Sequence, residues 1–98
     1  MYTHIVFWKL SGQGATADTQ AETILQALRA MPGKVEGLDS LQCGRNVSDS
    51  EASWDIYLIS THADEQAYVR YQDDTEHAAV KAIIGPLVRD RAVVDAQS

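Results

Sequence analysis

The fold is decided by the stretch Tyr2-Thr3-His4-Ile5-Val6-Phe7-Trp8-Lys9-Leu10. This run is rich in β-branched and aromatic residues, which predicts a strand. Because side chains alternate along a strand, His4, Val6, Trp8 and Leu10 share one face, and Thr3, Ile5, Phe7 and Lys9 share the other. Both faces are largely apolar. In a small protein such a strand has to be covered on both sides, for example by helices on one face and by the sheet of a second subunit on the other.

An amphipathic helix follows the first strand. Apolar residues recur with the i, i+3, i+4, i+7 spacing of a helix, and Pro32-Gly33 ends the pattern. These apolar positions are Ala21, Ile24, Leu25, Leu28 and Met31. Residues 38–47 and 54–61 then have the composition of two strands, joined by a polar hairpin loop at residues 48–53.

The second half of the chain contains two helical segments and a final strand. Thr61 and Asp64 have the spacing of an N-cap followed by an acidic residue, which predicts a short helix through Tyr71. After a polar break at residues 72–75, one face of another helix carries His77, Val80, Ile84 and Leu87. Gly85-Pro86 is expected to distort this helix near its end. Residues 91–95 supply the last strand, so the element order is βαββαβ in one α+β domain of residues 1–98 with an antiparallel sheet.

Composition narrows the possible partners and locations. The chain has 98 residues, of which 45% are hydrophobic, enough for one core. So short a chain gains stability from association, and we expect a homodimer. Its net charge of −6 argues against binding to nucleic acid or to an anionic membrane. The single Cys43 and the absence of a signal-peptide pattern after Met1 favour a cytoplasmic location.

Two side chains are candidates for acid–base chemistry. His77 lies on the apolar face at the start of its helix, where a neutral imidazole can accept or donate a proton. Tyr71 precedes His77 by six residues, which on an unbroken helix would place the two about 240° apart. If the chain bends at residues 72–75, the phenol and the imidazole converge on one cavity. The alternatives are a core histidine that satisfies a neighbouring carbonyl and a purely structural tyrosine.

His4 is the third candidate, because it alternates inward with other apolar residues of the first strand. The alternative for His4 is a buried strand histidine with one hydrogen bond. The residues expected to bind a substrate in the cavity are His4, Val6, Trp8, Ile56, Leu58, Val80 and Ile84.

Neither a metal nor a cofactor is expected. Asp73, Asp74 and Glu76 form an acidic group, but carboxylates are also favoured at a helix N-terminus by its dipole. His62 is expected to be a solvated loop residue, and no His/Cys spacing matches a zinc site.

Taken together, these segments resemble the stress-responsive A/B barrel family, called Dabb, over essentially the whole chain. The resemblance is carried by His4–Leu10, Pro32–Leu38, Gly44–Ser48, Trp54-Asp55, Tyr71 with His77, Pro86–Val88, Arg91 and Val93–Asp95. It implies a ferredoxin-like monomer whose sheet packs against that of a second copy to form a dimeric α+β barrel. Ile5 and Phe7 would then meet the partner, while His4, Val6 and Trp8 would face the helices and a cavity within the subunit.

The family also suggests a chemistry. It includes plant stress proteins and olivetolic acid cyclase, which closes a linear polyketide by aldol condensation. Tyr71, His77 and His4 match cavity residues of that cyclase. By this analogy His77 would remove a proton from carbon, and Tyr71 would donate a hydrogen bond to the oxygen that becomes negative. This chain departs from the family at residues 74–77, which replace a His-Pro-x-His run, and at Ile56, which replaces a pocket histidine of the cyclase.

These observations leave three functional hypotheses. The first is a homodimer that binds a small organic molecule in an apolar cavity and acts as a cofactor-independent cyclase or lyase. The second is a non-enzymatic stress-responsive or ligand-binding protein. The third is a monooxygenase of the dimeric α+β barrel superfamily, for which a haem would require an axial ligand in a larger pocket.

Overall fold

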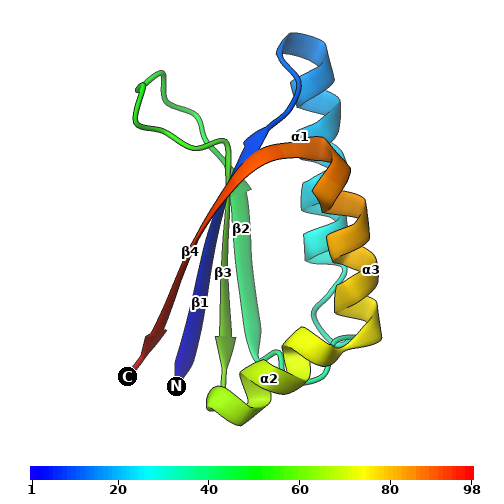
Figure 1. Cartoon of the computed structure of the whole chain (residues 1–98), viewed down its shortest axis with the longest axis vertical. Helices are drawn as coiled ribbons and strands as arrows, with labels where there is room; N and C mark the ends of the chain where they lie inside the picture. Colours follow the sequence, from blue (N-terminus) through cyan, green and yellow to red (C-terminus); the bar gives the residue numbers. More distant parts are fainter.

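The first strand lies inside a four-stranded antiparallel sheet. The computed structural model describes residues 1–98, and its strands are arranged in the order β2-β3-β1-β4 (Figure 1). The elements follow one another as β1 (Tyr2–Leu10), α1 (Gly14–Arg29), β2 (Ser40–Arg45), β3 (Ile56–His62), α2 (Glu65–Asp73), α3 (Thr75–Ile84), the 3-10 turn η1 (Gly85–Leu87) and β4 (Val88–Gln97). The predicted α+β, ferredoxin-like fold is confirmed.

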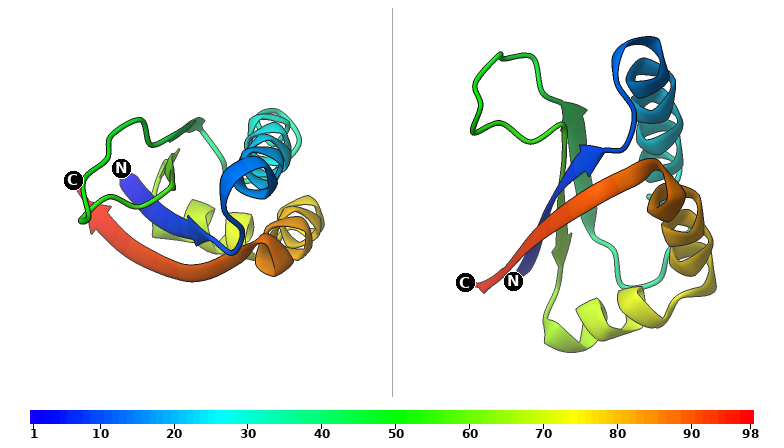
Figure 2. Two further views of the ribbon diagram at one scale, coloured as in Figure 1. Left: turned by 90° about the horizontal axis from the view of Figure 1, so that it is seen from above. Right: turned by 45° about the horizontal axis from the view of Figure 1, so that its top comes forward.

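Helices cover only one face of the sheet. In Figures 1 and 2, α1 and α3 run along the sheet on the same side, and α2 crosses the end at which both chain termini lie. None of these helices is long and apolar enough to cross a membrane.

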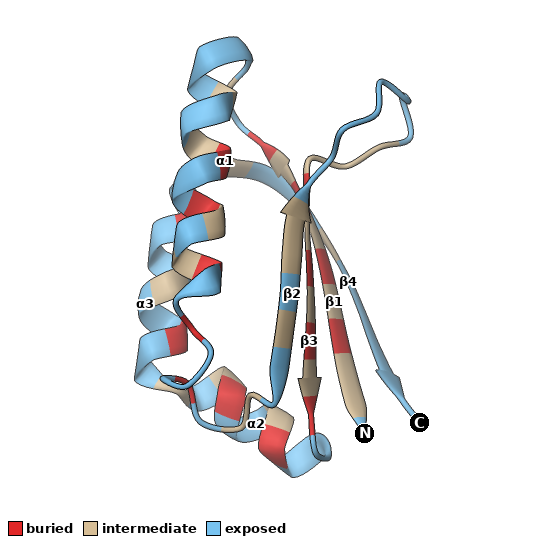
Figure 3. Cartoon of the chain, turned by 180° about the vertical axis from the view of Figure 1, so that it is seen from behind, coloured by how far each residue is buried: buried red, intermediate tan, exposed pale blue.

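The core lies between the sheet and the helices. The predicted inward face of β1 is confirmed, because its alternate residues from His4 to Leu10 are buried. Strand β3 alternates in the same way and buries Ile56, Leu58, Ser60 and His62. Figure 3 shows the buried positions of β1, β3 and the helices meeting across this layer. Ile24 and Leu28 of α1 are buried in the same core as these strand residues, as their spacing predicts.

The opposite face of the sheet has no helix over it. Ile5 and Phe7 of β1 and Ile59 of β3 are only half-buried there. Val94 lies opposite Ile5 in the β1–β4 register and is 55% exposed. The first strand is therefore apolar on both sides, and the single chain covers one of them.

Several predicted boundaries differ from the structure. The strand predicted at residues 38–47 is shorter and spans Ser40–Arg45, after a turn in which Gly37 is left-handed with φ of 81°. The strand predicted at 54–61 begins and ends later, at Ile56–His62, and the strand predicted at 91–95 extends over Val88–Gln97.

The predicted N-cap at Thr61 is wrong. Thr61 belongs to β3, and the Asp64 side chain caps α2 by accepting a hydrogen bond from the Ala67 backbone N–H at 2.8 Å. The strand can continue past Thr61 because its backbone pairs with β1 as far as His62, opposite Tyr2.

The predicted break between the two C-terminal helices is confirmed, and it is only one residue long. Asp74 leaves the helical conformation with ψ of 136°, and its side chain caps the next helix by accepting from the backbone N–H groups of Glu76 and His77. A third N–H group, that of Glu36, donates to the same carboxylate at 3.0 Å. The bend at Asp74 redirects α3 along the sheet.

Candidate functional site

A small cavity of about 130 Å³ lies between α3 and the inward face of the sheet. Eight of the nine predicted site residues line it: His4, Val6, Trp8, Leu58, Tyr71, His77, Val80 and Ile84. The remaining lining residues are Leu28, Lys81, Gly85, Val88 and Arg91. A cavity of roughly 150 Å³ holds a benzene molecule, so this one is of the size of a single small ring.

Ile56 is the predicted site residue that does not reach the cavity. Its side chain is 1% exposed and packs in the core below the loop at residues 46–55. Trp8 is present in the cavity wall, and its indole leaves the cavity open.

The bend at Asp74 brings His77 against Tyr71. The two rings stack with their centroids 4.0 Å apart and their planes at 25°. His77 Nδ1 lies 2.9 Å from the Tyr71 carbonyl oxygen, which can only accept, so Nδ1 carries the proton and Nε2 keeps the free lone pair. Burial, reinforced by the positive charge of Lys81, lowers the pKa of His77 to about 4. The imidazole is therefore neutral at pH 7 and able to accept a proton.

Tyr71 lines the cavity, and its buried hydroxyl group lacks a hydrogen-bond partner. The side chain is fully buried, and no hydrogen bond reaches its oxygen. Ser60 lies near this oxygen and opposes the rise in its pKa, but the Ser60 hydroxyl is engaged with His62 Nε2 at 2.9 Å. Burial raises the pKa of Tyr71 to about 12. The phenol therefore stays protonated at pH 7 and has a hydrogen bond to donate.

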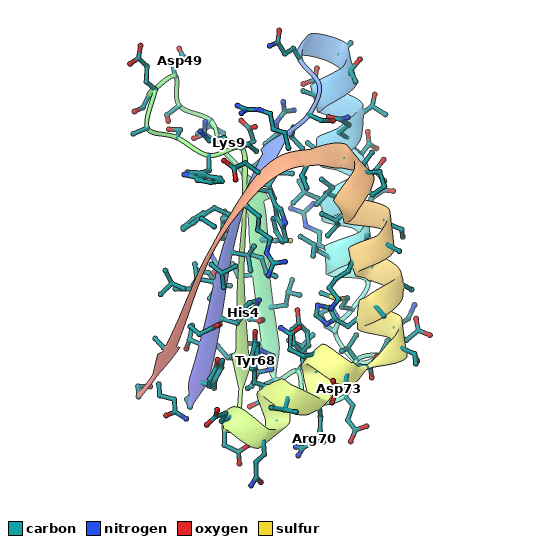
Figure 4. The ribbon with its side chains drawn as sticks, viewed as in Figure 1. His4, Lys9, Asp49, Tyr68, Arg70 and Asp73 are labelled. Atoms are coloured by element: carbon teal, nitrogen blue, oxygen red, sulfur yellow. The ribbon has the colours of Figure 1, made fainter.

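His4 is held by a carboxylate from the last strand. Its Nδ1 lies 2.5 Å from Asp95 Oδ1, and the two residues face each other in the β1–β4 register. Figure 4 shows His4 on β1 close to Tyr68 on α2, whose hydroxyl lies 3.3 Å from the same nitrogen. Gln72 donates to the Tyr68 hydroxyl at 2.6 Å. An aspartate at Nδ1 favours the tautomer in which Nε2 is the acceptor.

His62 is not the solvated loop residue that the sequence predicts. It is fully buried at the end of β3, where Nδ1 donates to the Gly37 carbonyl at 2.6 Å and Nε2 contacts the Ser60 hydroxyl. Burial lowers the pKa of His62. Because both nitrogens are occupied and the residue does not line the cavity, its role is to join β3 to the turn before β2.

The acidic residues near the bend do not gather around a common point. No group of three or more His, Cys, Asp or Glu side chains is placed to hold a metal ion. The Asp74 carboxylate instead binds three backbone N–H groups, and these hydrogen bonds, that of Glu36 first, lower its pKa.

Asp95 and Tyr68 contact the cavity residue His4, and sequence reasoning missed both. Asp95 reaches His4 only through the register of two strands that are 91 residues apart in sequence. The alternation of the last strand places Arg91, Val93 and Asp95 on one face, but it does not show which face is inward.

Comparison with known proteins agrees with this architecture. Residues 2–98 match the model of the Dabb family, the stress responsive A/B barrel domain. An uncharacterized protein of Streptomyces coelicolor is 29% identical over 83 residues, which cover 85% of this chain and 86% of that protein.

Two solved structures illustrate the range of similar proteins. A dimeric protein of unknown function with a ferredoxin-like fold, from Bacteroides fragilis, has a TM-score of 0.88 and 25% identity, and the match covers 99% of this chain and 95% of the other. A hydroxynitrile lyase from Passiflora edulis has a TM-score of 0.82 and 13% identity, with coverage of 97% and 90%. At that identity the second likeness shows the fold alone.

Proposed function

Since this chain belongs to the stress-responsive A/B barrel (Dabb) family, we propose that it is a homodimer that binds a small organic carbonyl compound in the cavity beside α3. We propose further that His77 and Tyr71 act there as a cofactor-independent acid–base pair, in the manner of a lyase or cyclase.

The observation that carries this proposal is the pairing of one free donor and one free acceptor at the same cavity. The Tyr71 hydroxyl is buried with no partner, although buried polar groups are nearly always hydrogen-bonded. His77 uses Nδ1 on a backbone carbonyl and keeps Nε2 free. A ligand carbonyl oxygen near the phenol would satisfy the hydroxyl group and place the adjacent carbon near the imidazole.

The chemistry follows from these roles. His77 Nε2 takes a proton from the carbon next to the carbonyl, the electron pair of the broken C–H bond forms a C=C bond, and the π pair of the C=O bond moves to the oxygen. The Tyr71 O–H donates a hydrogen bond to that oxygen as its charge develops. The resulting enolate can attack a second carbonyl, as in an aldol cyclisation, or regain the proton. A positioned base of this kind contributes about 10²–10⁴-fold in rate.

The dimer is supported by the sheet face that no helix covers. This face bears Ile5, Phe7 and Val94, and exposed apolar patches of this kind mark interaction sites. The Bacteroides fragilis relative with the same fold is described as dimeric. Packing two such faces together covers both sides of β1 and leaves the cavity of each subunit on the outer, helical side.

A second candidate function is ligand binding without catalysis. It is favoured by the hydrogen bond of His77 to the Tyr71 carbonyl and by the stack of the two rings, since both are structural uses of the same side chains. A pKa near 4 also makes His77 a weak base. The monooxygenase alternative and the cytoplasmic location stay predictions.

Hydrogen–deuterium exchange at carbon separates the two candidates. Cyclopentanone is small enough for the cavity, and NMR in D2O follows the loss of its protons next to the carbonyl. We expect the protein to accelerate this exchange. His77→Gln should remove at least about 100-fold of the acceleration because the base is lost, and Tyr71→Phe about tenfold or more because the oxygen loses its donor.

Tyr57→Phe is the matched control for the loss of a phenol. Tyr57 lies on the helix-free face of β3, where its hydroxyl accepts from Gln42 at 3.0 Å, and this variant should exchange like wild type. If cyclopentanone binds but does not exchange, the binding function replaces the catalytic one. Equal rates in wild type and His77→Gln would remove His77 from the mechanism.

A further inference from the structure

Two positive charges stand at the mouth of the cavity. Lys81 of α3 and Arg91 of β4 line it together with apolar residues, and both are exposed to solvent. Lys81 lies one turn after His77 on the same face of α3. Arg91 lies opposite Trp8 in the β1–β4 register, so it shares the inward face of the sheet. The two cations therefore approach the cavity from its two walls.

Neither cation has a carboxylate partner within the chain. The close contacts between basic and acidic side chains join His4 to Asp95, Arg45 to Asp18 and Arg70 to Glu36. The side chains of Lys81 and Arg91 form neither an ion pair nor a hydrogen bond, although the chain carries 14 acidic residues against 8 basic ones. Six of the eight basic side chains form no ion pair, but only Lys81 and Arg91 among them line this cavity, and no acidic residue lines it.

Both charges act on groups inside the cavity. Burial is the main cause of the lowered pKa of His77, and the Lys81 ammonium group is the next. The charge of Arg91 opposes the burial that raises the pKa values of Tyr71 and Tyr68. Both cations are thus close enough to interact with a ligand that occupies the cavity.

The two ends of the cavity differ in chemistry. His4, Tyr71 and His77 gather near the start of β1 and of α3, whereas Arg91 lies beside Trp8, four residues further along β1. At about 3.3 Å per residue, the backbone positions of His4 and Trp8 are roughly 13 Å apart. The wall between them is apolar and includes Val6, Leu58 and Ile84.

From this arrangement we infer that the ligand is a small organic acid, with an apolar ring or short chain in the cavity and a carboxylate held at the mouth by Lys81 and Arg91. This inference rests on the proposed function, because it assigns a chemical class to the ligand of the same cavity. The guanidinium group of Arg91 suits a carboxylate because its planar N–H groups can donate two parallel hydrogen bonds.

Benzoate and benzamide test the inference, because they have the same ring and nearly the same shape but differ in charge. Isothermal titration calorimetry at low salt should give benzoate an affinity at least about tenfold higher than benzamide, and about 0.3 M salt should reduce this difference by screening. Lys81→Gln and Arg91→Gln should each weaken benzoate binding about fivefold. Benzamide, which carries no charge, should lose clearly less affinity than benzoate in both variants.

Lys34→Gln and Arg89→Gln are the matched controls. Both remove one exposed positive charge from residues that do not line the cavity, and they should bind benzoate like wild type. If wild type binds benzoate and benzamide equally well, or if the control variants lose as much benzoate affinity as Lys81→Gln and Arg91→Gln, the inference of a carboxylate ligand is wrong. The cavity would then remain a site for an uncharged ligand. If neither compound binds, the proposed ligand site fails together with the inference.

Discussion

The imidazole of His77 stacks on the phenol ring of Tyr71, with the ring centroids 4.0 Å apart, although a helix end and a helix start separate the two residues. A continuous helix could not bring them together, because six residues correspond to about 240° of rotation. The single non-helical residue Asp74 makes the contact possible. The candidate site thus depends on the bend of the backbone at Asp74 more than on the length of either helix.

The lowered pKa of His77 predicts acid sensitivity. An unfolded histidine has a pKa near 6.5, whereas the folded one has a pKa of about 4, so between these values the unfolded state binds more protons. The contribution of His77 to the free energy of unfolding is therefore fully present above pH 6.5. It is lost as the pH falls toward 4, by an amount on the order of 3 kcal/mol. Urea unfolding between pH 7.5 and 4.5 measures the loss.

His77→Gln is the variant that isolates this contribution. It should show a shallower loss of stability on acidification, and the remaining slope should come in part from His62, whose pKa is also lowered by burial. An unchanged slope in His77→Gln would show that the imidazole is not held neutral in the folded protein.

The unpartnered Tyr71 hydroxyl predicts an unusual stability effect. A buried donor without a partner carries a desolvation penalty, so Tyr71→Phe should leave the free energy of unfolding unchanged or raise it by about 1 kcal/mol. Chemical denaturation of both proteins in the absence of ligand measures this. A loss of more than about 1.5 kcal/mol would mean that the hydroxyl forms a hydrogen bond in solution.

Two glycines with nearly the same φ are expected to differ in how much stability the protein loses when each is replaced by alanine. Gly33 and Gly37 have φ values of 83° and 81°. An added Cβ meets nothing within 4 Å at Gly33, whereas at Gly37 it lies 2.1 Å from the Ala67 carbonyl oxygen. Gly33→Ala should cost about 1 kcal/mol from the left-handed conformation alone, and Gly37→Ala about 3 kcal/mol or more because of the added clash. Thermal unfolding that gives equal losses would contradict the close approach of the Gly37 turn to α2.

The contact between His4 and Asp95 predicts a fixed tautomer. With Asp95 accepting from Nδ1, nitrogen-15 NMR of the imidazole at pH 8 should show His4 protonated at Nδ1. Asp95→Ala should allow the Nε2-protonated form to appear. Asp90→Ala, at an exposed position of the same strand, should leave the spectrum of His4 unchanged. A wild-type His4 protonated at Nε2 would argue against the positioning role of Asp95.

The helix-free sheet face predicts a charge-sensitive dimer. Val94 on that face and Val69 on α2 are similarly exposed, at 55% and 50%. Val94→Glu should weaken the dimer by at least about tenfold, because each subunit would bury a carboxylate in an apolar interface. Val69→Glu is the matched control and should remain dimeric in sedimentation equilibrium. Dissociation by both variants, or by neither, would point to a different interface.

Period-two and period-3.6 patterns were sufficient to predict the sheet, the helices and most of the cavity wall. The alternation in β1 identifies its inward residues correctly, and the polar residues around Asp74 correctly indicate the bend. The local N-cap pattern at Thr61 predicts a loop at His62, whereas the pairing of His62 opposite Tyr2 is a tertiary interaction. Its burial depends on a carbonyl 25 residues away. Such long-range pairings have no local signature.

β4 lies beside β1 and contributes to the site, although it is the last strand of the domain to be synthesised. The last strand supplies Val88 and Arg91 to a cavity whose other residues are all made earlier, and it supplies Asp95 to the cavity residue His4. A ribosome-bound chain that has not yet released β4 would therefore expose one edge of β1 and leave His4 without its carboxylate. The cavity wall, and the carboxylate contact of His4, are therefore complete only after β4 has been synthesised.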